Sequence, residues 1–307
     1  MRIPLITSRY QDLGRRKGGG GGGKGGGSGA KGGTGGSSGS SSSSSGGESN
    51  SKTSKVPITG SSASGKSTAT AYGSGGGKSI TIPTGQLFAG RTAGGATRGE
   101  MYGTRAYGSG YPGYSSYGVA GRGFPFWYWP VVWGASTNPY YHDPEYGDSS
   151  NSSRTGGPMA QANFVSNSTG STFHLLSDNS TISSLISSIH TNCSSNLSSS
   201  SSNSSSPYNS SAPGGPQPEQ AIQYYRSSSV VLTLDGYNNS ATFSSNINPN
   251  TTDTPLPSSG VDMTLLNCLN YTIGQAAPLI DGASSLSPPC LGFAALVWLA
   301  WFLAHYV

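Results

Sequence analysis

Charged side chains are scarce in this chain of 307 residues: only 9% are Asp, Glu, Lys or Arg, against about 25% in ordinary soluble domains. Its three Cys are too few and too scattered for a zinc site. The four His have no carboxylate or nucleophile at a spacing that suggests catalysis; they are His142, His174, His190 and His305. The sequence therefore predicts no catalytic residue, no metal site and no cofactor.

The charges that do occur are unevenly distributed. Residues 1–125 carry a formal net charge of +12 and the remainder −7. Residues 18–47 contain no large apolar side chain, so nothing there offsets the entropy lost on ordering the backbone. We expect residues 1–123 to be a disordered, basic Gly/Ser/Tyr-rich region. Its Tyr and Arg residues, among them Tyr107 and Arg122, could make weak cation–π contacts for self-association or could belong to an inert spacer.

Two patterns in the basic region resemble nucleotide or nucleic-acid sites. GSSASGKS, residues 60–67, matches the phosphate-binding loop pattern, but that loop needs a buried strand before it and a helix after it. A tract of Gly, Ser and Lys produces the pattern by chance, so we predict no nucleotide site. A single Gly-Arg-Gly at residues 121–123 does not favour nucleic-acid binding, whereas polyanions or cell-wall polysaccharide are candidate partners.

The most aromatic run of the chain, FPFWYWPVVWG, covers residues 124–134. Eleven residues interrupted by Pro125 and Pro130 are too few to span a membrane. The run could pack on the domain that follows, lie at a membrane surface or contact a partner. We treat residues 124–157 as an aromatic linker.

Signals of regular structure concentrate in residues 158–281 and occur twice. QANFVS and STFHLL flank a turn at residues 167–170, and the apolar residues of STISSLISSIHTNC then fall on one helix face, with Asp178 or Asn179 as N-cap. SVVLTL and SATFSS flank DGYNN, residues 235–239, and GVDMTLLNCLNYTIG follows as a second helix. Two ββα units predict an α+β domain with about four strands and both helices on one face of the sheet.

Two segments of this domain are less regular. Residues 194–218 are a Ser-rich stretch too long for an ordered connection, and we expect a disordered insert. PEQAIQYYR, residues 218–226, is compatible with a short helix or with a strand.

Asn-x-Ser/Thr sequons are about twice as frequent as the composition of residues 151–270 predicts, and none precedes residue 150. This distribution is typical of a glycosylated ectodomain. The predicted acceptors are Asn151, Asn167, Asn179, Asn192, Asn196, Asn203, Asn209, Asn238, Asn250 and Asn270.

The cysteines fit the same compartment. Cys193 and Cys268 fall on the two predicted helices, one in each unit. In an oxidising compartment, a disulfide between them would close a loop of about 75 residues and stabilise a small core. The alternative is two buried free thiols.

The chain ends in an uncharged apolar tail, residues 291–307, preceded by small residues and by Pro288 and Pro289. Small residues, a spacer and an apolar tail form the signal for a glycosylphosphatidylinositol anchor, with Gly282 or Ser284 as the attachment residue. The 17-residue tail spans about 26 Å as a helix, short of the hydrocarbon core of about 30 Å. A retained membrane helix and a buried core helix are the other interpretations of residues 282–307.

The first residues lack an apolar run of the length found in secretory signals. Because the tail, sequons and cysteines all indicate the secretory pathway, we expect an upstream exon to supply the signal.

FAGRTAGGATRGEMYGTRAYGSGYPG, GRGFPFWYWPVVWG and PEQAIQYYRSSSVVLTLDGYNNSATF together resemble uncharacterised glycine/serine-rich surface proteins of filamentous fungi, notably basidiomycetes. The resemblance implies a secreted glycoprotein of the cell surface with a glycosylphosphatidylinositol (GPI) anchor and no known activity. The matching residues are Gly90, Arg91, Tyr107, Gly108, Gly110, Tyr111, Pro112, Phe124, Pro125, Trp129 and Pro130. The alternative is a single-pass or tail-anchored membrane protein with a basic, disordered tail that binds polyanions or associates with itself.

Overall fold

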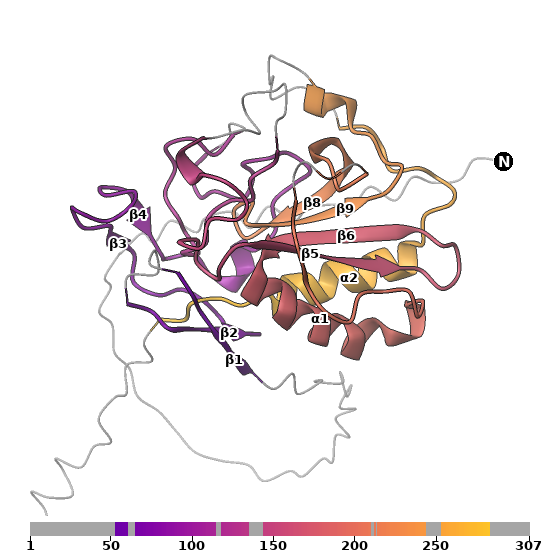
Figure 1. The fold of residues 1–307 in the computed structure, drawn as a ribbon, viewed down its shortest axis with the longest axis horizontal. Helices are drawn as coiled ribbons and strands as arrows, with labels where there is room; N and C mark the ends of the chain where they lie inside the picture. The colour runs from indigo at the N-terminus through magenta and orange to yellow at the C-terminus, as the bar shows by residue number, and fades with distance from the viewer. Residues whose placement is uncertain are drawn as a thin grey trace, which may run out of the picture. The chain divides into compact units, whose positions relative to one another are not determined.

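A computed structural model describes residues 53–60, 65–114, 118–134, 144–209, 212, 214–243 and 253–282. All of them belong to the second of two units into which the chain divides, Asn50–Val307. The described residues form two α-helices and several antiparallel sheets, so the predicted α+β class is confirmed (Figure 1).

The main sheet of the described residues has five strands, one more than predicted, in the order β7-β5-β6-β9-β8. Every neighbouring pair in it is antiparallel. The strands are β5 (Met159–Val165), β6 (Thr172–Asp178), β7 (Ser206–Pro207), β8 (Ala221–Tyr225) and β9 (Val230–Leu234).

Helices α1 (Asn179–Cys193) and α2 (Met263–Ala276) lie on the same side of this sheet (Figure 1). Each begins at an aspartate whose side chain accepts hydrogen bonds from the first turn: Asp178 from the N–H of Thr181, and Asp262 from those of Thr264 and Leu265. The apolar stripe of each helix is buried, as its 3.6-residue period predicts.

The second predicted hairpin is wrong in its outer strand. The partner of β9 is β8, from the segment left undecided, whereas Ser240–Phe243 of the expected strand SATFSS form a 3-10 helix. Asn239 explains the difference, because its side-chain oxygen accepts hydrogen bonds from the N–H groups of Ala241 and Thr254 and so turns the backbone away from a ladder.

The Ser-rich stretch 194–218 is not the disordered insert that we expected. After a 3-10 turn at Ser194–Asn196, the chain follows the edge of the sheet, and β7 pairs with β5. The hydroxyls of Ser201 and Ser202 accept hydrogen bonds from the N–H groups of Val165 and Asn163. Along β5, serine hydroxyls thus take the place of the backbone carbonyls that a neighbouring strand would supply. Residues 210, 211 and 213 of this stretch lie outside the described part.

The expectation of disorder through residue 123 is also wrong for the part that the structure describes. From residue 53 onward the chain forms two small antiparallel sheets and packs Met101, Tyr107 and Tyr111 into the core. The remaining elements are strands β1 (Ser54–Pro57), β2 (Thr68–Ala71), β3 (Ile80–Thr81) and β4 (Thr92–Ala93), and 3-10 helices at Arg98–Glu100, Pro144–Tyr146 and Pro218–Gln220.

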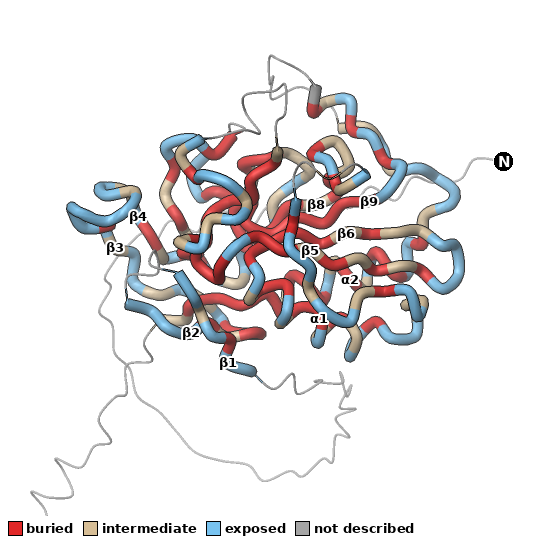
Figure 2. The backbone as a smooth tube through the Cα atoms, viewed as in Figure 1, coloured by how far each residue is buried: buried red, intermediate tan, exposed pale blue. Residues whose placement is uncertain are grey.

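The aromatic run 124–134 packs on the domain that follows, which was the first of its three interpretations. Figure 2 shows buried backbone through the centre of the molecule, and the side chains of Phe124, Trp127 and Trp133 are at most 4% exposed. The Trp133 indole N–H donates to the Tyr224 hydroxyl at 3.1 Å, and the Val131 N–H donates to the Ser228 carbonyl at 2.8 Å. The run is therefore part of the core and not a linker.

Candidate functional site

A disulfide joins the two helices on the sheet. It links Cys193, the last residue of α1, to Cys268 in α2, with their Cα atoms 5.8 Å apart. This is the pair that the sequence analysis selected over two free thiols. A bridge between residues 75 apart stabilises a fold by about 2–4 kcal/mol, chiefly by restricting the unfolded chain.

The sequon asparagines lie outside the core. Of the ten, Asn250 falls outside the described residues; none of the other nine is buried. Six are exposed, and Asn151, Asn196 and Asn270 are half-buried. The exposed six are Asn167, Asn179, Asn192, Asn203, Asn209 and Asn238.

Two adjacent asparagines differ in burial according to whether they begin a sequon. Asn239 is the one buried asparagine among the described residues, and it does not begin a sequon. Its amide nitrogen donates to the Asp253 carboxylate at 2.8 Å, which explains its burial. Asn238 beside it begins a sequon and is exposed. Every described acceptor position is thus at least partly open to the surface.

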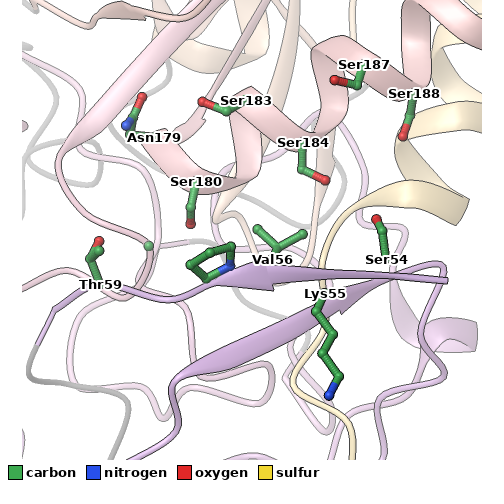
Figure 3. Close-up of a pocket in the computed structure, with 12 residues that line it drawn as sticks. Ser54, Lys55, Val56, Thr59, Asn179, Ser180, Ser183, Ser184, Ser187 and Ser188 are labelled. Atoms are coloured by element: carbon green, nitrogen blue, oxygen red, sulfur yellow. The ribbon is translucent and has the colours of Figure 1, made fainter.

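A groove lined by serine lies between α1 and β1 (Figure 3). It has a volume of about 450 Å³. In Figure 3, Ser180 and Ser184 point from α1 toward β1, and Val56 points back toward the helix. The lining residues are Ser54, Lys55, Val56, Pro57, Thr59, Gly156, Asn179, Ser180, Ser183, Ser184, Ser187 and Ser188.

The chemistry of this groove is that of hydrogen bonding without acid–base catalysis. Its lining holds seven serine or threonine hydroxyls and no Asp, Glu, His or Cys, and Lys55 is its one ionisable side chain. Hydroxyls donate and accept hydrogen bonds, so the lining matches a ligand that is itself rich in hydroxyl groups. A sequence signal for this surface exists, because α1 contains five serines and no Asp, Glu, Lys or Arg.

A buried arginine centre joins the aromatic run to the sheet. Arg226 donates to the Asp178 carboxylate at 2.7 Å and stacks 3.4 Å from the Tyr128 ring centroid. Arg154 donates to the carbonyls of Trp129 and Pro130. Burial lowers the pKa of Arg154 to about 10 and raises that of Tyr128. Because these groups are sealed from solvent, the centre has a structural role.

The sequence motifs that resemble chemistry have structural roles where they are described. The candidate phosphate loop lies between β1 and β2, which pair as an antiparallel hairpin, so a strand and not a helix follows it; residues 61–64 lie outside the described part. His174 contacts Asp235 at 3.1 Å, and the His190 ring contacts the Ser202 carbonyl at 2.8 Å. His142 and His305 lie outside the described residues. Within the described residues, no group of three or more His, Cys, Asp or Glu side chains is placed to hold a metal ion.

Of the two proposed lipid-attachment residues, Gly282 is the last residue that the structure describes. Gly282 is half-buried, and a Cβ placed on it would lie 3.2 Å from the Cα of Gly77. Ser284 and the apolar tail lie outside the described residues. Within the part that the structure describes, neither helix has the length and apolar character needed to cross a bilayer.

No protein-family model, curated protein or solved structure matches this chain significantly.

Sequence reasoning missed the serine groove because β1 falls in the segment expected to be disordered. It missed the arginine centre because the partners of Arg226 lie in three other segments, at Tyr128, Thr181 and Pro278.

Proposed function

We propose that this chain is a non-enzymatic glycoprotein of a cell surface or cell wall, attached to the membrane by lipid at Gly282 or Ser284. The observation that carries the proposal is the position of the sequons: all nine described acceptor asparagines lie outside the core, although the chain folds around one buried cluster. A glycan at these positions would start at a residue that is at least partly open to solvent, whereas at Asn239 it would start inside the core.

The disulfide supports the same compartment. Cys193 is buried and Cys268 is half-buried, and their bridge holds together α1 and α2. Stable disulfides of this kind belong to oxidising compartments, where N-linked glycosylation also takes place.

The serine groove supports a contact with polysaccharide, the partner class that the composition suggests. Its hydroxyls can exchange hydrogen bonds with those of a sugar chain, and Lys55 adds a cation for acidic sugars or other polyanions. The lining offers no carboxylate pair of the kind that hydrolyses a glycosidic bond, so the proposed contact is binding alone.

Mass spectrometry of the native protein tests the proposal. We expect glycopeptides at several of the ten sequons, a mass decrease on glycosidase treatment, and release from membranes by phosphatidylinositol-specific phospholipase. Asn267 is an exposed asparagine of α2 without a sequon, so Asn267→Gln serves as the matched control that leaves the glycan mass unchanged.

The alternative is an intracellular protein with a retained tail anchor and a basic polyanion-binding region. It predicts unmodified sequons, a cytosolic orientation and no release by phospholipase. Those three results together would exclude the glycoprotein.

A further inference from the structure

The outer face of α2 carries a patch of exposed apolar side chains. Among the described residues, five large apolar side chains are exposed, and three of them lie on α2 or against it: Tyr102 (42%), Met263 (48%) and Tyr271 (66%). Met263 and Asn270 are seven residues apart and so lie on the same face of the helix, with Tyr271 next to Asn270. We call Tyr102, Met263 and Tyr271 the α2 patch.

Tyr102 reaches this face from a distant part of the chain. Its hydroxyl donates to the Asn270 carbonyl at 3.3 Å, and its ring lies 5.7 Å from that of Tyr225. A Cβ added to Gly274 would lie 2.0 Å from the Tyr102 hydroxyl oxygen, so the glycine leaves the space that Tyr102 occupies. Burial, and next the nearby Tyr271 hydroxyl, raise the pKa of Tyr102. Tyr271 is one residue after Asn270 and three before Gly274, so it lies beside the part of α2 that Tyr102 contacts.

Asn270 stands within this patch and begins the sequon Asn-Tyr-Thr. The Tyr225 hydroxyl donates to its Oδ1 at 2.7 Å. Because the side-chain amide is planar, this bond directs Nδ2, the atom that carries a glycan, away from Tyr225. Tyr271 follows Asn270 in the helix and the Tyr102 hydroxyl donates to the Asn270 carbonyl, so both tyrosines lie next to the residue from which a glycan would extend.

We propose that the glycan on Asn270 is a structural element of the fold, whose first sugar rings stack on Tyr102 and Tyr271 and cover the α2 patch. This inference rests on the proposed function. A pyranose ring presents C–H groups on its face, which pack on an aromatic ring as other apolar groups do. An apolar patch left exposed favours association, and a covalently attached sugar covers it without a separate binding step.

The test is a double-mutant cycle on the full-length protein made in a glycosylating host. The four proteins are wild type, Asn270→Gln, Tyr271→Ala and the double variant. Tyr271→Ala keeps the sequon and changes an exposed side chain, so the glycan remains attached while one stacking surface is lost. We expect Asn270→Gln to lower the midpoint of thermal unfolding by about 2–4 °C in the wild-type background and by much less in the Tyr271→Ala background.

Two controls separate the glycan from the asparagine itself. Asn203→Gln removes an exposed sequon flanked by serines and should leave the midpoint unchanged. The same cycle in a disulfide-forming host without N-glycosylation measures the loss of the Asn270–Tyr225 hydrogen bond alone, and it should show no coupling to Tyr271.

Three results would overturn the proposal. Asn270 without sugar while other sequons carry it, or an occupied Asn270 with equal effects in both backgrounds, would show that the glycan does not stabilise the patch. A wild-type dimer that Tyr271→Ala dissociates would assign the patch to a second copy. Failure of the proposed function looks different, since no sequon would then be occupied.

Discussion

Residues 53–157 and residues 158–282 fold by different means. In the second region β5, β6, β8, β9 and the two helices are five to fifteen residues long. In the first, strands are two to four residues long and the chain reverses at glycine. Sixteen glycines with positive φ lie in the described residues of the first region and four in those of the second. Glycine adopts these angles without strain, so a Gly-rich chain can build a compact layer almost without regular structure.

The two regions nevertheless share one core. The turn between β8 and β9 contacts the aromatic run. Its Ser228 carbonyl accepts a hydrogen bond from the Val131 N–H, and its Arg226 guanidinium stacks on the Tyr128 ring. Arg122 stacks 4.9 Å from the Tyr111 ring centroid, inside the molecule. Cation–π pairs that the composition suggested for self-association thus hold the first region together. Composition alone does not distinguish the two uses.

The largest effect should come from Trp133→Ala, which removes a side chain shared by both regions. Trp133 is 1% exposed, packs on Tyr208 and donates to Tyr224. Truncating a buried tryptophan lowers the free energy of unfolding by about 3–5 kcal/mol. Urea unfolding measures this, with Leu87→Ala, an exposed apolar residue, as the control expected to change it by less than about 0.5 kcal/mol. A loss for Trp133→Ala as small as the control's would mean that the aromatic run is not part of the core.

A smaller effect should come from Gly108→Ala, which tests the glycine-built layer. Gly108 has a φ of +86°, and a Cβ there would lie 2.1 Å from the carbonyl oxygen of Gly118. Gly113 has a similar φ of +79° with no atom within 4 Å of its Cβ position. Both alanines should cost about 1–2 kcal/mol for the left-handed backbone. Gly108→Ala should cost about 1–3 kcal/mol more because backbone must move; equal midpoints in urea for the two variants would contradict the close approach.

The difference between the regions also explains what could be predicted from sequence. Helix α1, helix α2 and the β5–β6 hairpin follow from local periodicity and turn residues. Strand β8 remained undecided because its turn, Arg226 to Ser229, reverses with positive φ at Arg226, Ser227 and Ser228 instead of at glycine. The Arg226 side chain donates hydrogen bonds to the hydroxyls of Ser229 and Thr181 and so holds that turn. Thr181 is 45 residues away and is not visible in a local window.

The candidate sites divide in the same way. Sequons and cysteines are local patterns, so their residues could be named in advance. The serine groove and the α2 patch need β1 and Tyr102, two pieces of the first region, next to α1 and α2. Both pieces belong to a stretch rich in glycine and serine, a composition that indicates disorder when read locally. Only the long-range core brings them to the helices.

The smallest change in the free energy of unfolding is expected at Asp262, the N-cap of α2, which contacts the turn of the β5–β6 hairpin. The Asp262 carboxylate accepts hydrogen bonds from the hydroxyls of Ser166 and Ser168 at 2.6 and 2.9 Å, and from the N–H groups of Thr264 and Leu265. Burial alone would raise its pKa, but these bonds outweigh burial and lower it. Asp262→Ala should therefore cost about 1 kcal/mol at pH 6.

The pH dependence of that cost identifies its origin. A carboxyl whose pKa is lower in the folded state stabilises the fold above its unfolded pKa of about 3.9, and this contribution is lost as the pH falls through the folded value. Asp262→Asn is the matched variant, since asparagine also caps helices but does not ionise. Urea unfolding of both proteins from pH 6 to pH 2.5 should show the wild-type advantage shrinking below about pH 4. A constant difference over that range would mean that the cap stabilises α2 through its shape and not through its charge.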